Sequence, residues 1–254
     1  MNTAYLRYTV VISLLFSVFL GLSAIALAKD ASNKLHGADL IEVASDVVGN
    51  VDECKSIAVD VLSRYEPFLA EFEKLTIHTD TSTRRGLSDG RVIFVRCLED
   101  KTEFEHVLIH EIGHVIDLSH LVSSRGFRTR FTDFGDPIYS RDLSTRFYNI
   151  SWSNNEDWLP RASEEDFVSK YASSNPFEDF AETYLMYIEH GEIFRYVAFD
   201  KENEILQKKY NFVKYVIFNG KEFGLDEDVS LEAVLKFGEG FSPIFDMTKL
   251  FNLV

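Results

Sequence analysis

The chain has few cysteines, few cationic residues and no internal repeat. Cys54 and Cys97 are its only cysteines, and neither lies in a metal-ligand pattern, which argues against a zinc site built from thiolates. Lysine and arginine number 26 against 41 aspartates and glutamates, so the formal net charge is −15. Such an acidic surface repels nucleic acid and anionic lipid, and we expect neither as a partner. With 254 residues, 46% of them hydrophobic, the chain is long enough for one substantial core.

The N-terminus resembles a secretory signal. An apolar run over 8–28 follows Arg7 and ends in Ala-Leu-Ala, which predicts cleavage after Ala28. The mature chain, 29–254, would then be secreted or periplasmic, with no stable membrane association. The run is also long enough to span a bilayer, so an uncleaved anchor is the alternative.

An extracytoplasmic location also bears on the two cysteines. In an oxidising compartment, a disulfide between Cys54 and Cys97 is the default expectation, and two buried thiols are the alternative.

The hydrophobic pattern predicts an α+β fold. Apolar residues spaced three and four apart indicate helices over 38–74, 102–118, 163–170, 176–190 and 200–218. Alternating β-branched and aromatic residues indicate strands over 75–79, 91–97 and 147–152. We therefore expect one domain over 29–254, mostly helical, with a small sheet beside the helix at 102–118. The aromatic-rich tail from 221 to 254 is expected to pack on this body.

The strongest chemical signal is H-E-x-x-H at His110, Glu111 and His114. On a helix the two histidines lie one turn apart on the same face, so both imidazoles can bind one metal ion. Glu111 is rotated about 100° away and can instead take a proton from a metal-bound water. The alternative is a chance motif whose histidines are ordinary core residues. The helix is apolar nearly all round, however, so its polar side chains need partners.

A zinc site of this kind needs a third protein ligand, and His120 is one candidate. It completes the metzincin spacing H-E-x-x-H-x-x-G-x-x-H, except that Asp117 replaces the glycine that turns the chain back. If the helix continued, His120 would lie about 15 Å beyond His110 along the axis. Neither Met186 nor Met247 is well placed for a methionine turn. An ordinary residue at a helix end is the alternative reading of His120.

A second candidate follows the expected helix cap at Asn175. Pro176 suits the first turn of that helix. On a helical wheel, Glu178 and Glu182 fall together at the edge of the apolar stripe, while Asp179 falls on the opposite, solvent side. One glutamate could bind the metal while the other fixes the tautomer of a ligating histidine. The alternative is a solvated helix flank.

These segments resemble a known family. H-E-I-G-H-x-x-D, followed by Y-A-S-S-N-P-F-E-D-F-A-E, is similar to the gluzincin-type zinc peptidases grouped around anthrax lethal factor. The resemblance implies a zincin-like domain in which Glu178 is the third ligand and Glu182 supports a zinc-binding histidine, His110. It also implies that Tyr171, seven residues before Glu178, stabilises the oxyanion. It covers roughly 100–220 and leaves 121–170 without a counterpart.

The sequence therefore predicts a secreted zinc endopeptidase that acts on protein or peptide substrates. One Zn²⁺ per chain would be held by His110, His114 and Glu178, and the catalytic part would span about 75–220. Glu111 and Tyr171 would be the catalytic residues. The alternatives are a metzincin-like peptidase that uses His120 and an inactive zinc-binding interaction protein.

Overall fold

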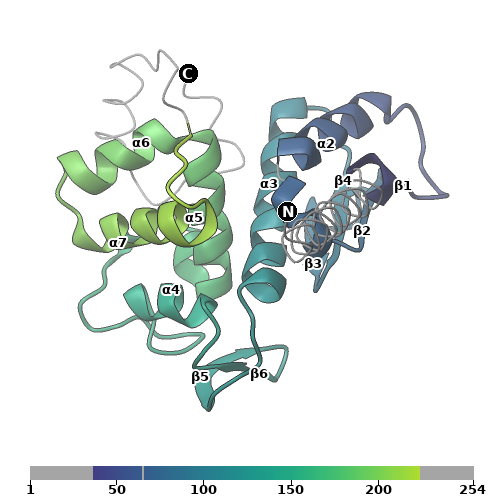
Figure 1. Ribbon diagram of the computed structural model, residues 1–254. Coiled ribbons are helices and arrows are strands. Elements are labelled where there is room, and N and C mark those ends of the chain that lie inside the picture. The colour runs from purple at the N-terminus through teal and green to yellow at the C-terminus, as the bar shows by residue number, and fades with distance from the viewer. Residues whose placement is uncertain (1–36, 65, 224–254) are drawn as a thin grey trace, which may run out of the picture. The chain divides into compact units, whose positions relative to one another are not determined.

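The fold is α+β, with a small sheet beside a larger set of helices (Figure 1). The computed structural model describes residues 37–64 and 66–223, and these fall in one compact unit. The signal peptide expected over 1–28, and the part of the expected tail over 224–254, lie outside the described residues. Within the described part of the chain, no helix combines the length and the apolar character that crossing a membrane requires.

Two sheets are present in the described residues. Their strands are β1 (Ile41–Val43), β2 (Lys74–His78), β3 (Gly86–Asp89), β4 (Val92–Arg96), β5 (Arg128–Asp133) and β6 (Asp136–Tyr139). The larger sheet has the order β1-β2-β4-β3, in which β3 pairs with β4 antiparallel and the other pairs are parallel. Strands β5 and β6 form a separate antiparallel hairpin. β3 is therefore an edge strand.

The helices account for most of the core. In chain order they are α2 (Asp52–Arg64), α3 (Lys101–Val115), α4 (Ser144–Ser151), α5 (Pro176–Glu189), α6 (Gly191–Arg195) and α7 (Glu204–Phe212). Short 3-10 segments lie at Gly37–Leu40, Glu66–Glu71, Glu164–Asp166 and Ala172–Ser174. One turn of π-helix extends α3, α6 and α7, at Ile116–His120, Tyr196–Asp200 and Val213–Ile217 respectively.

Helix α3 lies between the sheet and α5. It packs against β3 and β4 on one side and runs beside α5 on the other (Figure 1). Strand β4 shows why the sheet forms there: Ile93 and Val95 are fully buried, while Phe94 between them is 39% exposed. This alternation turns one face of the strand toward the core. α3 is therefore covered on both sides, which agrees with its nearly continuous apolar sequence.

Several predictions from the sequence are confirmed. The α+β class holds, the helices expected at 102–118 and 176–190 are α3 and α5, and the strands at 75–79 and 91–97 are β2 and β4. A disulfide joins Cys54 in α2 to Cys97, as expected. It ties α2 to the chain between β4 and α3.

Other predicted elements are wrong. The stretch 147–152, expected as a strand, belongs mostly to α4, because its aromatic residues pack inward at helical spacing. The expected helix at 163–170 is only one 3-10 turn, and the helix expected over 200–218 begins at Glu204, after the cap Asn203. In 38–74, only α2 is α-helical, and Ile41–Val43 is a strand paired with β2.

Asp179 corrects the helical-wheel prediction for α5. Its carboxylate is fully buried, not solvated, because α7 covers that face of the helix. Lys209 Nζ in α7 donates to Asp179 at 2.8 Å and to the Asp166 carbonyl at 2.8 Å, and Trp152 Nε1 donates to Asp179 at 2.9 Å. This buried ion pair joins α5 to α7.

Candidate metal centre

The H-E-x-x-H segment is positioned by a well-formed helix. Asp100 caps α3 by accepting hydrogen bonds from the backbone of Thr102 at 3.0 Å and of Glu103 at 3.1 Å. Two and a half turns further on, His110 and Glu111 are buried, with 5% and 6% of their surface exposed. Buried polar side chains of this kind require partners.

The partners come from α5. Asn175 caps this helix, and its Oδ1 accepts from the backbone N–H groups of Phe177 and Glu178 at 3.0 Å each. Gly113 lets α5 approach α3 closely, because a Cβ at Gly113 would lie only 3.0 Å from Cα of Ala181. The two glutamates of α5 can therefore reach the histidines of α3.

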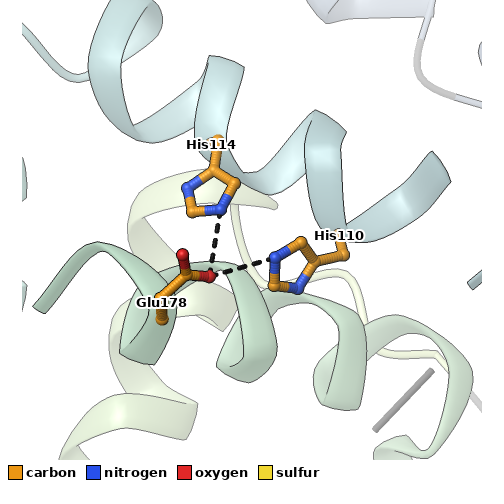
Figure 2. Close-up of side chains that lie close together, drawn as sticks. All are labelled: His110, His114 and Glu178. Atoms are coloured by element: carbon orange, nitrogen blue, oxygen red, sulfur yellow. Dashed lines mark ion pairs between the residues drawn. The ribbon is translucent and has the colours of Figure 1, made fainter. Parts of the chain in front are cut away.

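Three side chains from these helices meet at one point (Figure 2). Oε2 of Glu178 lies 3.2 Å from Nε2 of His110 and 3.2 Å from Nε2 of His114. The rings of His110 and His114 meet edge to face, with centroids 4.8 Å apart. In the described residues this is the one group of histidine, cysteine and acidic side chains arranged to hold a metal ion.

The spacing fits a tetrahedral zinc site. Ligand atoms about 2.0–2.1 Å from such a zinc ion lie about 3.3 Å from one another. Oε2 of Glu178 is also buried and has no hydrogen bond of acceptable geometry among the described residues. A buried oxygen that two imidazole nitrogens approach without a good hydrogen bond is explained by a cation between the three atoms. The residues present therefore fit a zinc ion.

The electrostatics favour a charged Glu178. Burial raises its pKa, but the interactions with His110 and His114 outweigh this effect and hold the pKa well below its usual range. Burial lowers the pKa of His110, while the carboxylates of Glu178 and Glu182 raise it further, so the net pKa lies well above its ordinary value. A metal ion would take the place of the proton, and its charge would balance both carboxylates.

Glu182 lies behind His110. Its Oε1 is 2.8 Å from Nδ1 of His110, and the carboxylate is fully buried. Ser169 donates to Oε2 of the same carboxylate at 2.6 Å, and its own Oγ accepts from the backbone N–H of Ala172 at 2.9 Å. The carboxylate fixes Nδ1 as the protonated nitrogen of His110, which leaves Nε2 free to bind a metal.

Glu111 lines the cleft beside the three-residue group. Gly86, the first residue of β3, packs directly against it: a Cβ at Gly86 would lie 2.8 Å from Cγ of Glu111 and 2.8 Å from Cγ1 of Val107. Glycine is therefore required at this point of the strand for Glu111 to keep its place.

Tyr171 lies at the mouth of the same cleft. Its ring stacks on His110 with centroids 5.9 Å apart, and 46% of the residue is exposed. Partial burial, followed by the charge of Glu178, raises the pKa of the phenol. The hydroxyl therefore stays protonated at neutral pH and can donate a hydrogen bond.

The structure does not bring His120 to this group. Asp117 does not turn the chain back. It is buried in the π-helical turn, where the Tyr148 hydroxyl donates to its carboxylate at 2.5 Å. His120 consequently ends up near Glu71, at 3.3 Å, with its ring against Phe68 at 5.0 Å. The metzincin-like alternative fails because no residue with left-handed backbone ends the helix at 117.

The three-residue group opens into a cleft of about 830 Å³. It is lined by β3 and the loop before it, and also by the tip of the β5–β6 hairpin. The sequence did not identify either of these two parts of the wall. Residues 80–90 contain glycine and other turn-forming residues, which hid β3, and the hairpin lies in the segment that has no counterpart in the family resemblance. The available signal for β3 was the sequence Gly-Leu-Ser-Asp at 86–89, which lies directly before the strand expected at 91–97.

A helix carrying H-E-x-x-H, packed on a small sheet and facing a glutamate of a second helix, is the arrangement of a zinc metallopeptidase domain. Comparison with known families agrees: residues 101–216 match the model of the Peptidase_Mx family, described as "Putative zinc-binding metallo-peptidase". The match runs from the start of α3 through α7, so it contains both helices of the metal group. No curated protein and no solved structure was found to match the chain. Together, the match and the geometry support a zinc metallopeptidase.

Proposed function

We propose that the protein is an exported, zinc-dependent endopeptidase of the gluzincin type, similar to the peptidases grouped around anthrax lethal factor. The observation that carries the proposal is the meeting of His110 Nε2, His114 Nε2 and Glu178 Oε2 in a cleft that Glu111 also lines. A purely structural zinc site is normally closed by four protein ligands. The described residues supply three ligands, which leaves a fourth position for water or substrate.

Each residue of the site has a separate role in peptide hydrolysis. Zinc in such a site lowers the pKa of water to about 7 and polarises a carbonyl. Glu111 takes the proton of the attacking water and delivers it to the leaving amine as the C–N bond breaks. Tyr171 donates a hydrogen bond to the developing oxyanion, a role worth about 2.7–4 kcal/mol for comparable donors. Glu182 keeps His110 in the tautomer that binds metal.

The substrate proposed is an extended peptide. Among the described residues, β3 pairs with β4 on one edge only, and its Gly86, Leu87 and Ser88 line the cleft. A free strand edge beside the catalytic group can bind a peptide through main-chain hydrogen bonds. This arrangement favours a protein or peptide substrate over a compact small molecule.

Export is supported by the Cys54–Cys97 disulfide and by the apolar run that ends at Ala28. Determination of the N-terminal residue of the protein isolated from its producer tests this part. Cleavage after Ala28 gives a chain beginning at Lys29, whereas an intact N-terminus contradicts cleavage and favours the anchor.

Activity is tested with the Glu111→Gln variant. We expect the wild-type protein to cleave casein or a peptide library, and a chelator to abolish the cleavage. Glu111→Gln should keep its zinc and lose turnover about 10²–10⁴-fold, because only the proton-transfer group is removed. His120→Ala is the matched control and should keep both its zinc and its turnover. Undiminished turnover by Glu111→Gln would remove Glu111 from the mechanism, and a zinc-loaded wild type that cleaves nothing would favour a binding protein.

A further inference from the structure

The cleft carries positive charge on one wall. Arg84, Arg85 and Arg96 line it from the loop before β3 and from the end of β4. This grouping is notable in a protein with a formal net charge of −15, because most of its surface repels anions.

The three arginines are not equally available to a ligand. Arg85 forms an ion pair with Glu103 of α3. Nη1 of Arg96 donates to the carbonyl oxygens of Thr81 at 3.2 Å and Thr83 at 3.1 Å, which holds the loop before β3 in place. The exposed Arg84 has no ion-pair partner among the described residues. Arg84 is therefore a free cation on a loop that Arg96 holds in position.

The β5–β6 hairpin adds an acidic side chain to the same cleft. Asp133, at the end of β5, lines the cleft next to Phe134, which is fully exposed at the hairpin tip. Burial raises the pKa of Asp133; His114 lowers it, and the charges of Asp136 and Asp89 raise it further. Asp133 therefore interacts electrostatically with His114 and, more weakly, with Asp89, the last residue of β3.

The order of charges along β3 follows from its sequence. Arg84 lies two residues before the strand, which begins at Gly86 and ends at Asp89, a residue that interacts electrostatically with Asp133. At about 3.3 Å per residue, the three steps of strand from Gly86 to Asp89 cover roughly 10 Å, and the segment from Arg84 extends this length at its start. Gly86 touches Glu111, so the catalytic group lies within this span.

We propose that the cleft selects peptides that carry an acidic residue on one side of the scissile bond and a basic residue on the other. Arg84 binds the acidic side chain and Asp133 the basic one. A guanidinium suits this task because its planar N–H groups match a carboxylate in a bidentate geometry. The inference rests on the proposed peptidase function, and it names the substrate class of that site.

The test uses four peptides of equal length around one cleavable core: acidic before and basic after the core, the reverse order, glutamine at both positions, and acidic at both. An extended peptide lies along β3 in one direction, so one of the two mixed orders should have a kcat/KM about tenfold above the glutamine peptide. The reverse order should show no gain, and the doubly acidic peptide should show less than the favoured order, because its second acidic residue meets Asp133 instead of a basic partner. Equal cleavage of both mixed orders and the neutral peptide overturns the proposal.

Variants identify the residues responsible. Arg84→Gln should remove the gain from the acidic residue and keep the gain from the basic residue, and Asp133→Asn should do the reverse. Arg84→Glu should favour a basic residue at the position where the wild type favours an acidic one. Lys208→Gln is the matched control, since Lys208 is an exposed cation on α7 outside the cleft. An unchanged preference in Arg84→Gln would contradict the assignment.

A binding experiment separates this inference from the proposed activity. Zinc-loaded Glu111→Gln protein is titrated with the same peptides, and the favoured mixed order should bind about tenfold more tightly than the neutral peptide at low salt. The difference should shrink as salt screens the charges. Charge-dependent binding without wild-type turnover contradicts the peptidase proposal and keeps the charge selectivity. Turnover by the wild type with no charge preference in either experiment contradicts the charge selectivity and keeps the peptidase proposal.

Discussion

The contact between Gly86 and Glu111 gives the account a sharp prediction. In Gly86→Ala, the new Cβ would lie 2.8 Å from Cγ of Glu111, whereas ordinary contact begins at 3.4 Å. The Glu111 side chain, or the strand, must therefore move by at least 0.6 Å, the difference between these distances. Displacement of a catalytic group by about 1 Å costs roughly 10²-fold in rate, or about 2.7 kcal/mol of transition-state stabilisation. Metal binding should be untouched, because the atoms nearest to the new Cβ belong to Glu111 and Val107 and not to the three ligands.

The assay compares kcat/KM on the best peptide substrate with zinc per chain in the same preparation. Gly86→Ala should lose activity about 100-fold and keep its zinc. Ser88→Ala is the control, because it alters the same strand without adding volume. Activity within twofold of the wild type would refute the reasoning that Gly86 keeps Glu111 in place. Parallel loss of zinc and activity would instead show that the strand supports the whole metal group.

Two further predictions concern buried charge. Lys209→Met should lower the free energy of unfolding by about 3–5 kcal/mol in urea denaturation, because it leaves the carboxylate of Asp179 buried without its cation. The double variant Asp179→Leu/Lys209→Met should recover much of this loss, and equal stability of the single variant and the wild type would contradict the role of the pair. His190 is a buried imidazole, and burial together with the nearby His106 lowers its pKa to about 3. Since the unfolded state takes up the proton near pH 6.5, this group contributes full stability above pH 6.5 and loses it progressively as the pH falls toward 3. Between pH 6.5 and 4.5, His190→Gln should lose about 2 kcal/mol less than the wild type, and parallel stability curves would refute this assignment.

Helices α3 and α5 were predictable because their signals are local. Each has a side-chain cap, at Asp100 and Asn175, and a helical repeat of apolar residues that extends for several turns. The candidate ligands lie on these two helices. Their spacing was enough to propose that one of the two glutamates shares a metal ion with the histidines, and the family resemblance indicated Glu178.

The remaining elements depend on contacts between distant segments. Asp179 was expected in solvent because a helical wheel describes one helix, whereas Lys209 reaches it from a helix thirty residues further along the chain. The stretch 147–152 has strand-like composition, but most of it lies in α4, where Phe147 packs against Phe180 and Phe212. Its helical conformation is therefore determined by tertiary packing, which outweighs the local strand propensity of its residues.

The walls of the cleft were the least predictable part of the site. Strand β3 is short and lies in a sequence of turn-forming residues, and it exists because β4 pairs with it and α3 covers it. Ser169, which supports Glu182, has no sequence pattern that distinguishes it from other serines. Its role follows only from the approach of the 163–174 segment to α5.

The most direct test of the central claim is the zinc content per chain, after dialysis, of the wild type, Glu178→Ala and His120→Ala. Circular dichroism of all three proteins establishes that they are folded. We expect one zinc in the wild type and in His120→Ala, and loss of zinc in Glu178→Ala, because among the described residues it is Glu178 that meets His110 and His114 in the metal-binding group. Retention of zinc by Glu178→Ala, or its loss in His120→Ala alone, would contradict the metal centre described here.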